Sequence, residues 1–399
     1  MKTAGIICEY NPFHLGHAGH IEKTHQALGD DTAIVCVMSG NFVQRGDFAI
    51  FNKHARAKMA VNCGADLIIE LPAPYVLLSA EGFAEAGVYL LDSLGICDYL
   101  SFGSEDGDIN TLTDAANTIV SGRADTITKQ WLNKGVSYAS AQQKAADVLL
   151  GARADVFRSP NNVLGIEYIK ALRKYGSKMQ PLTVLRTGGG HDSDTGYSAS
   201  ALRKALIRGS LPDELMPQSA AAVCLEEIIS GRGPVSVKNA ELAVLSRLRA
   251  IGSYSGLQGA SEGLERRFKR FAACEPSVAS ILKKVKTKRY TMSRLRRMLM
   301  CAVLGISNED TVHPPPYIRV LAMNPTGMEL LGAVRKKTKL PVIIKPASVH
   351  KQNDSVKRMF SIEAAATDFY ALLYPKEDER VGGWEWRQSP IVATGLPAH

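Results

Sequence analysis

The chain has 399 residues, of which 45% are hydrophobic and 22% charged, and its formal net charge is +9. These values are ordinary for globular proteins, so the disordered, collagen-like and coiled-coil classes are excluded. At roughly 150 residues per domain, the length predicts two or three domains with enough chain for a sizeable hydrophobic core.

The positive charge is concentrated in one part of the chain. Residues 1–215 contain 20 basic and 23 acidic side chains, whereas residues 216–399 contain 28 basic and 16 acidic ones. Residues 265–297 alone contain 12 basic and two acidic side chains. A charge run is most often a solvated face, but this concentration favours a polyanionic partner.

Seven cysteines are scattered along the chain, and no two of them are closer than 27 residues. No pair has the spacing of a zinc or redox motif, so buried structural thiols are expected. The apolar run at the N-terminus is too short for a signal peptide, and no later run is long enough to span a bilayer. We therefore expect a cytoplasmic protein without membrane attachment, and no feature predicts an obligate protein partner.

Apolar runs alternate with helical patterns through the first half of the chain. The predicted strands are 4–8, 33–38, 67–70, 99–102 and 183–186, and the predicted helices are 15–28, 53–63, 80–94, 109–121, 138–150, 162–175 and 198–207. Near-continuous apolar strands separated by helices are typical of a parallel sheet that is covered on both faces. The predicted fold class is therefore α/β, with a Rossmann-like domain over residues 1–215.

The pattern changes after Pro212–Pro217, so residues 216–399 are predicted to form a second, basic and mainly helical domain. Its predicted helices are 237–249, 261–273, 276–286 and 291–303. Residues 317–373 are then predicted to form a small α/β unit, with strands at 317–323 and 341–344 and helices at 326–337 and 355–373. The tail from Pro375 is rich in Gly, Pro and charge and is expected to be mobile.

A histidine motif stands where the first predicted strand meets the first predicted helix, within residues 11–20 (NPFHLGHAGH). In open α/β sheets this edge is the usual place for a ligand. Gly16 would let a phosphate chain approach the backbone, and a helix start offers N–H groups and a favourable dipole. His14 and His17 could then donate hydrogen bonds to phosphate oxygens as charge develops. Ordinary surface or capping histidines are the alternative, but the placement favours phosphate binding.

A second helix start, at residues 197–203 (YSASALR), follows a predicted strand and the glycines 188–190. The hydroxyls of Ser198 and Ser200 and the guanidinium of Arg203 would suit the β- and γ-phosphates. Alone the pattern is weak, because Ser-x-Ser before a helix is most often a plain cap. Together with the histidine motif it predicts the second half of a nucleotide clamp.

These two motifs together resemble the nucleotidyltransferase superfamily, of the His-x-Gly-His type. Six longer blocks are similar to the tRNA(Met) cytidine acetate ligase family, and they span both halves of the chain: residues 7–20 (ICEYNPFHLGHAGH), 38–50 (MSGNFVQRGDFAI), 64–72 (GADLIIELP), 101–105 (SFGSE), 159–172 (SPNNVLGIEYIKAL) and 288–295 (KRYTMSRL). The resemblance implies an enzyme that forms acetyl-adenylate from acetate and ATP. It further implies that the acetyl group is transferred to the wobble cytidine of elongator tRNA(Met), giving N4-acetylcytidine. Ala199, where many superfamily members have a second hydroxyl, and Asp47-Phe48, where Glu-Pro is expected, depart from the pattern.

The resemblance also implies an ATP site at named positions. These are Ile7, Cys8, Glu9, Tyr10, Asn11, Pro12, Phe13, His14, Leu15, Gly16, His17, Ala18, Gly19 and His20, with Gly103, Asn162 and Arg186. His14, His17, Ser200 and Arg203 are the predicted catalytic residues. From the residues alone, Gly103 could be a plain turn glycine, Asn162 a helix cap and Arg186 part of a surface ion pair. No cluster of acidic residues marks a metal site, so any Mg²⁺ is expected mainly on the ATP phosphates.

The loop at residues 39–47 is predicted to cover the active site, with Gln44 and Arg45 as candidates for substrate contact. Solvated loop residues are the alternative for these two side chains. The basic residues of the next helix, Lys53, Arg56 and Lys58, are predicted to form a solvated face.

The basic stretch at residues 265–297 predicts an RNA interface. The predicted tRNA contacts are Arg266, Arg267, Lys269, Arg270, Lys288, Arg289, Arg294 and Arg297. Phe268, Phe271 and Tyr290 are interleaved with them, and phosphate neutralisation with occasional base stacking suits a folded RNA. Two alternatives remain: a small-molecule adenylyltransferase that makes a dinucleotide cofactor, and an RNA-binding protein without catalysis. The basic half disfavours the first, and the nucleotide clamp disfavours the second.

Overall fold

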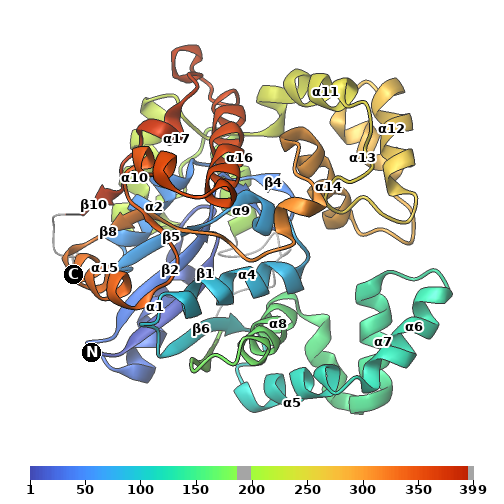
Figure 1. Ribbon diagram of the computed structural model, residues 1–399, viewed down its shortest axis with the longest axis horizontal. Coiled ribbons are helices and arrows are strands. Elements are labelled where there is room, and N and C mark those ends of the chain that lie inside the picture. The colour runs from blue at the N-terminus through green and yellow to red at the C-terminus, as the bar shows by residue number, and fades with distance from the viewer. Residues whose placement is uncertain (187–198, 394–399) are drawn as a thin grey trace.

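A mixed sheet organises the chain, seen in a computed structural model that describes residues 1–186 and 199–393 (Figure 1). The strands lie in the order β10-β8-β5-β2-β1-β6-β7, with β9 beside β8. Their bounds are β1 Thr3–Cys8, β2 Ala33–Ser39, β5 Leu67–Leu71, β6 Tyr99–Ser104, β7 Gln180–Leu185, β8 Ile318–Met323, β9 Val342–Ile343 and β10 Ile391–Val392.

The five strands from the first half of the chain, β5, β2, β1, β6 and β7, are parallel. Counted among themselves they lie in the order 3-2-1-4-5, and the direction of winding reverses between β1 and β6. This is the Rossmann-type arrangement, in which a ligand lies in the crevice at the carboxyl ends of the strands where the order reverses. The predicted α/β class and all five predicted strands are confirmed.

Helices cover both faces of the sheet, as near-continuous apolar strands require. One hydrophobic cluster joins one face to α4 (Ala80–Ser93), α8 (Pro160–Lys174) and α15 (Pro325–Lys337). A second cluster joins the other face to α1 (Leu15–Leu28), α2 (Lys53–Asn62), α9 (Ala199–Ile207) and α10 (Gln218–Ile229). Along β2, Val35 and Val37 enter the first cluster and Cys36 the second, as the two-residue period of a strand dictates.

The basic helices form a separate region with a core of their own. They are α11 (Glu241–Ala250), α12 (Leu264–Cys274), α13 (Val278–Val285) and α14 (Met292–Leu304). Helix α16 (Asp354–Ala371) joins this region to the sheet, because its Phe360 packs into the sheet core and its Phe369 into the helical core. The helices predicted for the basic stretch are confirmed.

A further group of helices, which we call the helical arm, comprises residues 109–158. It consists of α5 (Ile109–Val120), α6 (Arg123–Asn133), α7 (Tyr138–Leu150) and a 3-10 segment (Gly151–Arg158). The arm lies at the lower right of Figure 1, while α11–α14 lie at the upper right. Helix α6 was not predicted from the sequence.

Two features of the C-terminal part differ from the predictions: the place of the small α/β unit and the order of the tail. The small α/β unit exists as β8-α15-β9, but β8 pairs antiparallel with β5, with Leu67 opposite Met323, so it extends the first-half sheet. A boundary at residues 215/216 therefore does not separate the sheet from the second half. The tail is ordered as far as residue 393, since β10 pairs with β8 and Glu385 is buried. Strand β8 (IRVLAM) is buried at every position, so it requires a place inside a sheet.

No helix in residues 1–186 and 199–393 is long and apolar enough to cross a membrane.

Candidate active site

His14 is the N-cap of α1 and His17 lies in its first turn, and together they form a capping box. His14 Nδ1 accepts a hydrogen bond from the Gly16 backbone at 3.0 Å, and His17 Nδ1 accepts one from the His14 backbone at 3.3 Å. The rings are stacked, with centroids 3.8 Å apart. Because each Nδ1 is an acceptor, a neutral ring carries its proton on Nε2, which is then a donor.

Aromatic residues before the helix support the histidine rings. The ring centroids of Tyr10 and Phe13 lie 4.9 and 5.5 Å from that of His17. Phe13 is fully buried and Tyr10 nearly so, and the Tyr10 hydroxyl lies 3.4 Å from Cys36 Sγ. These residues therefore hold the loop from within the core.

The second predicted motif meets the first. Arg203, one turn into α9, donates a hydrogen bond from Nη1 to the carbonyl of Asn11 at 2.8 Å. Leu202 and Leu206 are buried in the same core as Phe13, and Ser200 lies in the first turn of α9. Ser198 and the glycines 188–190 lie outside the described residues. For the part that is described, the two halves of the predicted clamp lie together.

The other predicted ATP residues lie on the β6 side of the crevice. Gly103 belongs to β6 and does not follow it, and a Cβ atom there would lie 3.0 Å from Arg186 Cγ, so the glycine makes room for Arg186. Asn162 Oδ1 accepts hydrogen bonds from the backbones of Glu105 and Asp106, at 2.8 and 3.1 Å. Asn162 thus fixes the loop that follows β6, while Arg186 is exposed.

His20 faces the same side of the sheet. Its Nε2 lies 3.0 Å from the Ser101 hydroxyl. Burial lowers the pKa of His20 to about 4, and the positive charges of Arg186 and Lys23 add to this effect. The imidazole is therefore neutral at pH 7, in positive surroundings that suit a phosphate.

Arg56 is the main correction to the sequence analysis. It is completely buried, and its guanidinium donates to the backbone carbonyls of Phe51, Glu9, Ser39 and Gly40. It therefore ties the carboxyl ends of β1 and β2 to α2, and the prediction of a solvated face is wrong. The reason is that these carbonyls at the strand ends need donors, and the long side chain reaches them.

Lys53 is also buried, at the centre of an ionic cluster. Its Nζ lies 2.7 Å from Glu70, 2.6 Å from Glu385 and 3.8 Å from Glu363, and Arg319 lies 3.1 Å from Glu385. Burial and the neighbouring Glu70 raise the pKa of Glu363 well above its usual range. No sequence spacing could have revealed this cluster, because its members come from α2, β5, β8, α16 and the tail.

The predicted covering loop is a short hairpin, with β3 at Phe42–Val43 and β4 at Asp47–Phe48. On one side the Gln44 backbone donates to Glu9 Oε1 at 2.6 Å, directly after β1. Burial raises the pKa of Glu9, while the charges of Arg56, Arg203 and Arg45 oppose the shift. On the other side, Gly46 packs against the backbone of α14. The hairpin therefore connects the histidine loop with the basic helices; the roles of Gln44 and Arg45 stay predictions.

Some of the predicted tRNA contacts in the basic stretch are exposed to solvent, and others form ion pairs or hydrogen bonds within the protein. Arg266, Lys269, Arg270 and Lys288 are exposed. Arg289 and Arg294 share the carboxylate of Glu262, at 3.2 and 3.0 Å, and Arg267 donates to the Lys284 carbonyl. Burial lowers the pKa of Arg297 to about 10.

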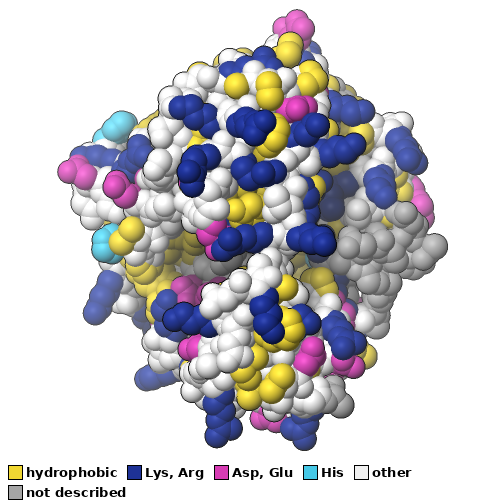
Figure 2. All heavy atoms as spheres, turned by 90° about the vertical axis from the view of Figure 1, so that its right-hand side faces the viewer, with side chains coloured by type: hydrophobic (Ala, Val, Ile, Leu, Met, Phe, Trp, Pro, Cys, Tyr) yellow, Lys and Arg dark blue, Asp and Glu magenta, His cyan; other side chains and the backbone are white. Residues whose placement is uncertain are grey.

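The aromatic part of the RNA prediction is largely wrong. Phe268 and Tyr290 are buried in the core of the helical region, because they face inward on amphipathic helices and turns. Phe271 alone stays partly exposed, beneath Arg267 and Arg270. Figure 2 shows Lys and Arg side chains over the face that these helices share with the helical arm.

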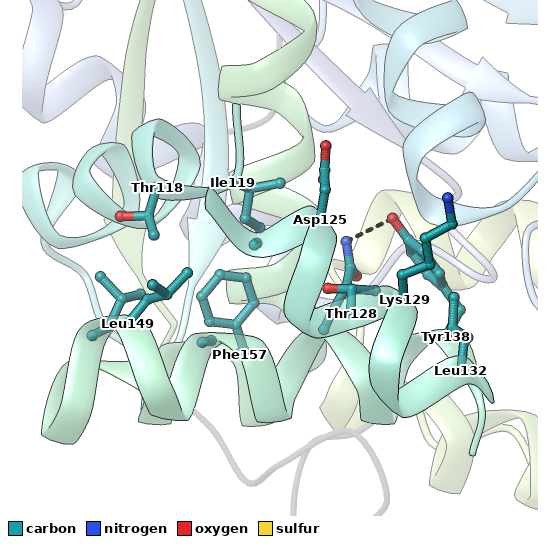
Figure 3. Close-up of a pocket in the computed structure, with 13 residues that line it drawn as sticks. Thr118, Ile119, Asp125, Thr128, Lys129, Leu132, Tyr138, Leu149 and Phe157 are labelled. Atoms are coloured by element: carbon teal, nitrogen blue, oxygen red, sulfur yellow. Dashed lines mark hydrogen bonds between the residues drawn. The ribbon is translucent and has the colours of Figure 1, made fainter. Parts of the chain in front are cut away.

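A cavity of about 200 Å³ lies inside the helical arm, away from the histidine loop (Figure 3). Ile119, Leu149 and Phe157 line its apolar part, and Lys129 and Tyr138 lie at its polar end. It is a gap between α5, α6 and α7 and does not belong to the clamp. Within the described part of the chain, no group of three or more His, Cys, Asp or Glu side chains could hold a metal ion.

Known proteins share this whole architecture. Residues 1–383 match the family described as HIGH Nucleotidyl Transferase. A tRNA(Met) cytidine acetate ligase of Acetivibrio thermocellus is 38% identical over 98% of this chain and 100% of its own. The chain belongs to this ligase family. The ligase of the same name from Caldicellulosiruptor saccharolyticus is 39% identical over 98% of each chain.

Solved structures from the tRNA(Met) cytidine acetate ligase family agree with the fold described above. The crystal structure of Thermotoga maritima TmcAL bound with alpha-thio ATP is 32% identical and has a TM-score of 0.91, covering 99% of this chain and 100% of that one. The apo form of the same protein is 31% identical, with a TM-score of 0.93 over the same shares of both chains. The family resemblance noted in the sequence is confirmed over both halves.

Proposed function

We propose that the protein acetylates a tRNA cytidine in two ATP-dependent steps at one site. In the first step an acetate oxygen attacks the α-phosphorus of ATP and the bond between the α-phosphorus and the bridging oxygen of the β-phosphate breaks. The products are acetyl-adenylate and pyrophosphate. In the second step the exocyclic amine of the cytidine attacks the acetyl carbonyl, loses a proton and displaces AMP. The proposed acceptor is the wobble cytidine of elongator tRNA(Met), in keeping with the name of the relatives.

The hydrogen bond from Arg203 to the Asn11 carbonyl is the observation that carries this proposal. It brings the start of α9 to the His14–His17 turn, at the edge where the strand order reverses. Adenylation needs orientation and stabilisation of phosphate charge more than proton transfer. His14 and His17 would donate to phosphate oxygens from one side, and Ser200 and Arg203 from the other.

The rest of the ATP site is proposed as residues 7–20 with Gly103, Asn162 and Arg186. The backbone after β1 and the first turn of α1 suit the triphosphate, since a helix N-terminus binds anions. Exposed Arg186 and neutral His20 would lie near the phosphates. Mg²⁺ would neutralise part of the phosphate charge when bound, held mainly by the phosphates themselves.

The helical region α11–α14 is proposed as the tRNA-binding part. The exposed residues Arg266, Lys269, Arg270 and Lys288 suit phosphates most directly, because Arg289 and Arg294 already share a carboxylate. The ATP-activating part would then comprise residues 1–215 together with the returning strands from 318 onward.

The first step is tested by the exchange of labelled pyrophosphate into ATP without RNA. We expect exchange that depends on acetate. Exchange that requires a phosphorylated small molecule in place of acetate would favour the adenylyltransferase alternative, and no exchange with any acid would refute the activation step.

A further inference from the structure

The helical arm (residues 109–158) begins at the edge of the sheet that holds the candidate site. Four residues separate it from β6, and β6 is parallel to β1, so both strands end at the same edge. The basic helices meet that edge from the other side, because α14 packs against the hairpin that follows β2. The arm and the basic helices therefore flank the histidine loop.

Part of the arm's charge is not neutralised within the arm. Arg153 pairs with Asp114 at 3.4 Å and Arg158 with Asp155 at 3.3 Å. The remaining basic residues of the arm form no ion pair with any described carboxylate: Arg123, Lys129, Lys134 and Lys144. These four cations lie on α6, its end and α7.

Two of these lysines meet at one indole ring. Lys134 Nζ lies 4.1 Å from the centroid of the Trp131 ring, and Lys144 Nζ lies 4.3 Å from it. Each ammonium is attracted by the ring, yet the two positive charges repel each other. A phosphate group near either ammonium would offset this repulsion.

Figure 2 shows that the arm and the basic helices face the same way, with Lys and Arg side chains on both and a hollow between them. A folded RNA whose target base enters the site at the sheet edge would lie across this face. Binding of an acidic protein or a membrane surface would not explain why basic side chains lie on both sides of a nucleotide site, whereas binding of an RNA substrate would.

We propose that the helical arm is a second binding surface for the RNA substrate, with Trp131, Lys134 and Lys144 contacting its phosphate backbone. The RNA is then gripped on both sides of the candidate site, by α12–α14 on one side and by α6–α7 on the other. This inference rests on the proposed function, because that function supplies the RNA.

The test compares two charge-reversed proteins in binding to tRNA at several salt concentrations. Lys134→Glu with Lys144→Glu changes the arm, and Arg335→Glu with Lys336→Glu is the matched control at the end of α15, where both side chains are exposed. We expect the arm variant to bind at least about tenfold more weakly, with a salt slope smaller by about two, since each phosphate contact contributes roughly 0.9. The control should stay within about twofold of the wild type.

A second readout follows the arm directly. Binding of tRNA should change the tryptophan fluorescence of the wild type, and Trp131→Phe should remove most of that change while Trp384 and Trp386 remain. Unaltered affinity of the arm variant, or the same fluorescence change in Trp131→Phe, would overturn the inference. Failure of the proposed function would show differently, as a wild-type protein without acetate-dependent pyrophosphate exchange.

Discussion

Gly46 lies so close to Arg297 that a Cβ atom on the glycine would overlap the backbone nitrogen of the arginine. The glycine also has a φ of +76°, which other residues adopt only with strain. The backbone N–H of Gln44, in the same hairpin, donates a hydrogen bond to the Glu9 carboxylate beside the histidine loop. The hairpin therefore holds α14 at a fixed distance from that loop. A substrate held by the basic helices, as proposed, would thereby be positioned relative to the proposed site of adenylation.

Gly46→Ala should separate the hairpin from α14. We expect a loss of unfolding free energy of about 2–4 kcal/mol, combining about 1 kcal/mol for the left-handed backbone with about 1–3 kcal/mol for overpacking. Gly256→Ala is the control, because its φ is +81° and no atom lies within 4 Å of its Cβ position. Denaturant unfolding measures both, and equal losses would show that the hairpin is not wedged against α14.

The His14→Asn variant tests whether His14 acts only as a helix cap or also as a donor in the reaction. Asparagine is among the best N-cap residues, so the unfolding free energy should change by less than about 1 kcal/mol. The imidazole donor is lost, and acetate-dependent pyrophosphate exchange should fall about 10²–10³-fold. Exchange near the wild-type rate would mean that His14 serves only as a cap.

Lys53→Met removes the centre of the buried ionic cluster. Breaking a buried pair leaves uncompensated charge, so the unfolding free energy should fall by about 3–5 kcal/mol. Lys58→Met is the control on the same helix: Lys58 pairs with Glu226 at the surface, and its loss should cost less than about 1 kcal/mol. A Lys53 variant as stable as the Lys58 variant would show that the tail is not anchored through this cluster.

His20 should titrate in the free protein near pH 4, against about 6.5 in an unfolded chain. Between these values the folded state binds fewer protons, so the contribution of His20 to stability is complete above about pH 6.5 and is lost as the pH falls toward 4. NMR of the imidazole measures the pKa, which should rise when ATP is added, because phosphate charge offsets Arg186 and Lys23. A pKa near 6.5 without ATP would contradict the structure around Ser101.

The local elements could be predicted from the sequence, but the distant pairings could not. The helical pattern predicts α1 and the apolar runs predict β1 and β2, whereas the capping role of His14 was only the alternative to phosphate binding. In contrast, nothing in the order of residues indicates that Leu67 lies opposite Met323. Lys53 and Arg56 looked like surface charges, because a buried cation differs from an exposed one only in its partners. Those partners, such as Glu385, come from remote parts of the chain.

For the candidate site too, the sequence predicted the local motifs but not the contacts between remote elements. His14, His17 and Arg203 lie together because each stands at a helix start beside a strand end, which the sequence pattern reveals. The contact of Gly46 with α14 and the neutral state of His20 depend on packing between remote elements. Phe268 and Tyr290 show the converse error: an aromatic residue within a basic stretch suggests base stacking, but packing buries Phe268 on its helix and Tyr290 in the segment before α14.

The most direct test of the proposed function is to incubate the protein with ATP, labelled acetate and total tRNA, and to digest the RNA to nucleosides. We expect the label in N4-acetylcytidine from tRNA(Met), dependent on ATP and strongly reduced with His14→Asn. Label that appears only in a small dinucleotide, or RNA that stays unlabelled while pyrophosphate exchange proceeds, would contradict the assignment of a tRNA cytidine as the acetyl acceptor.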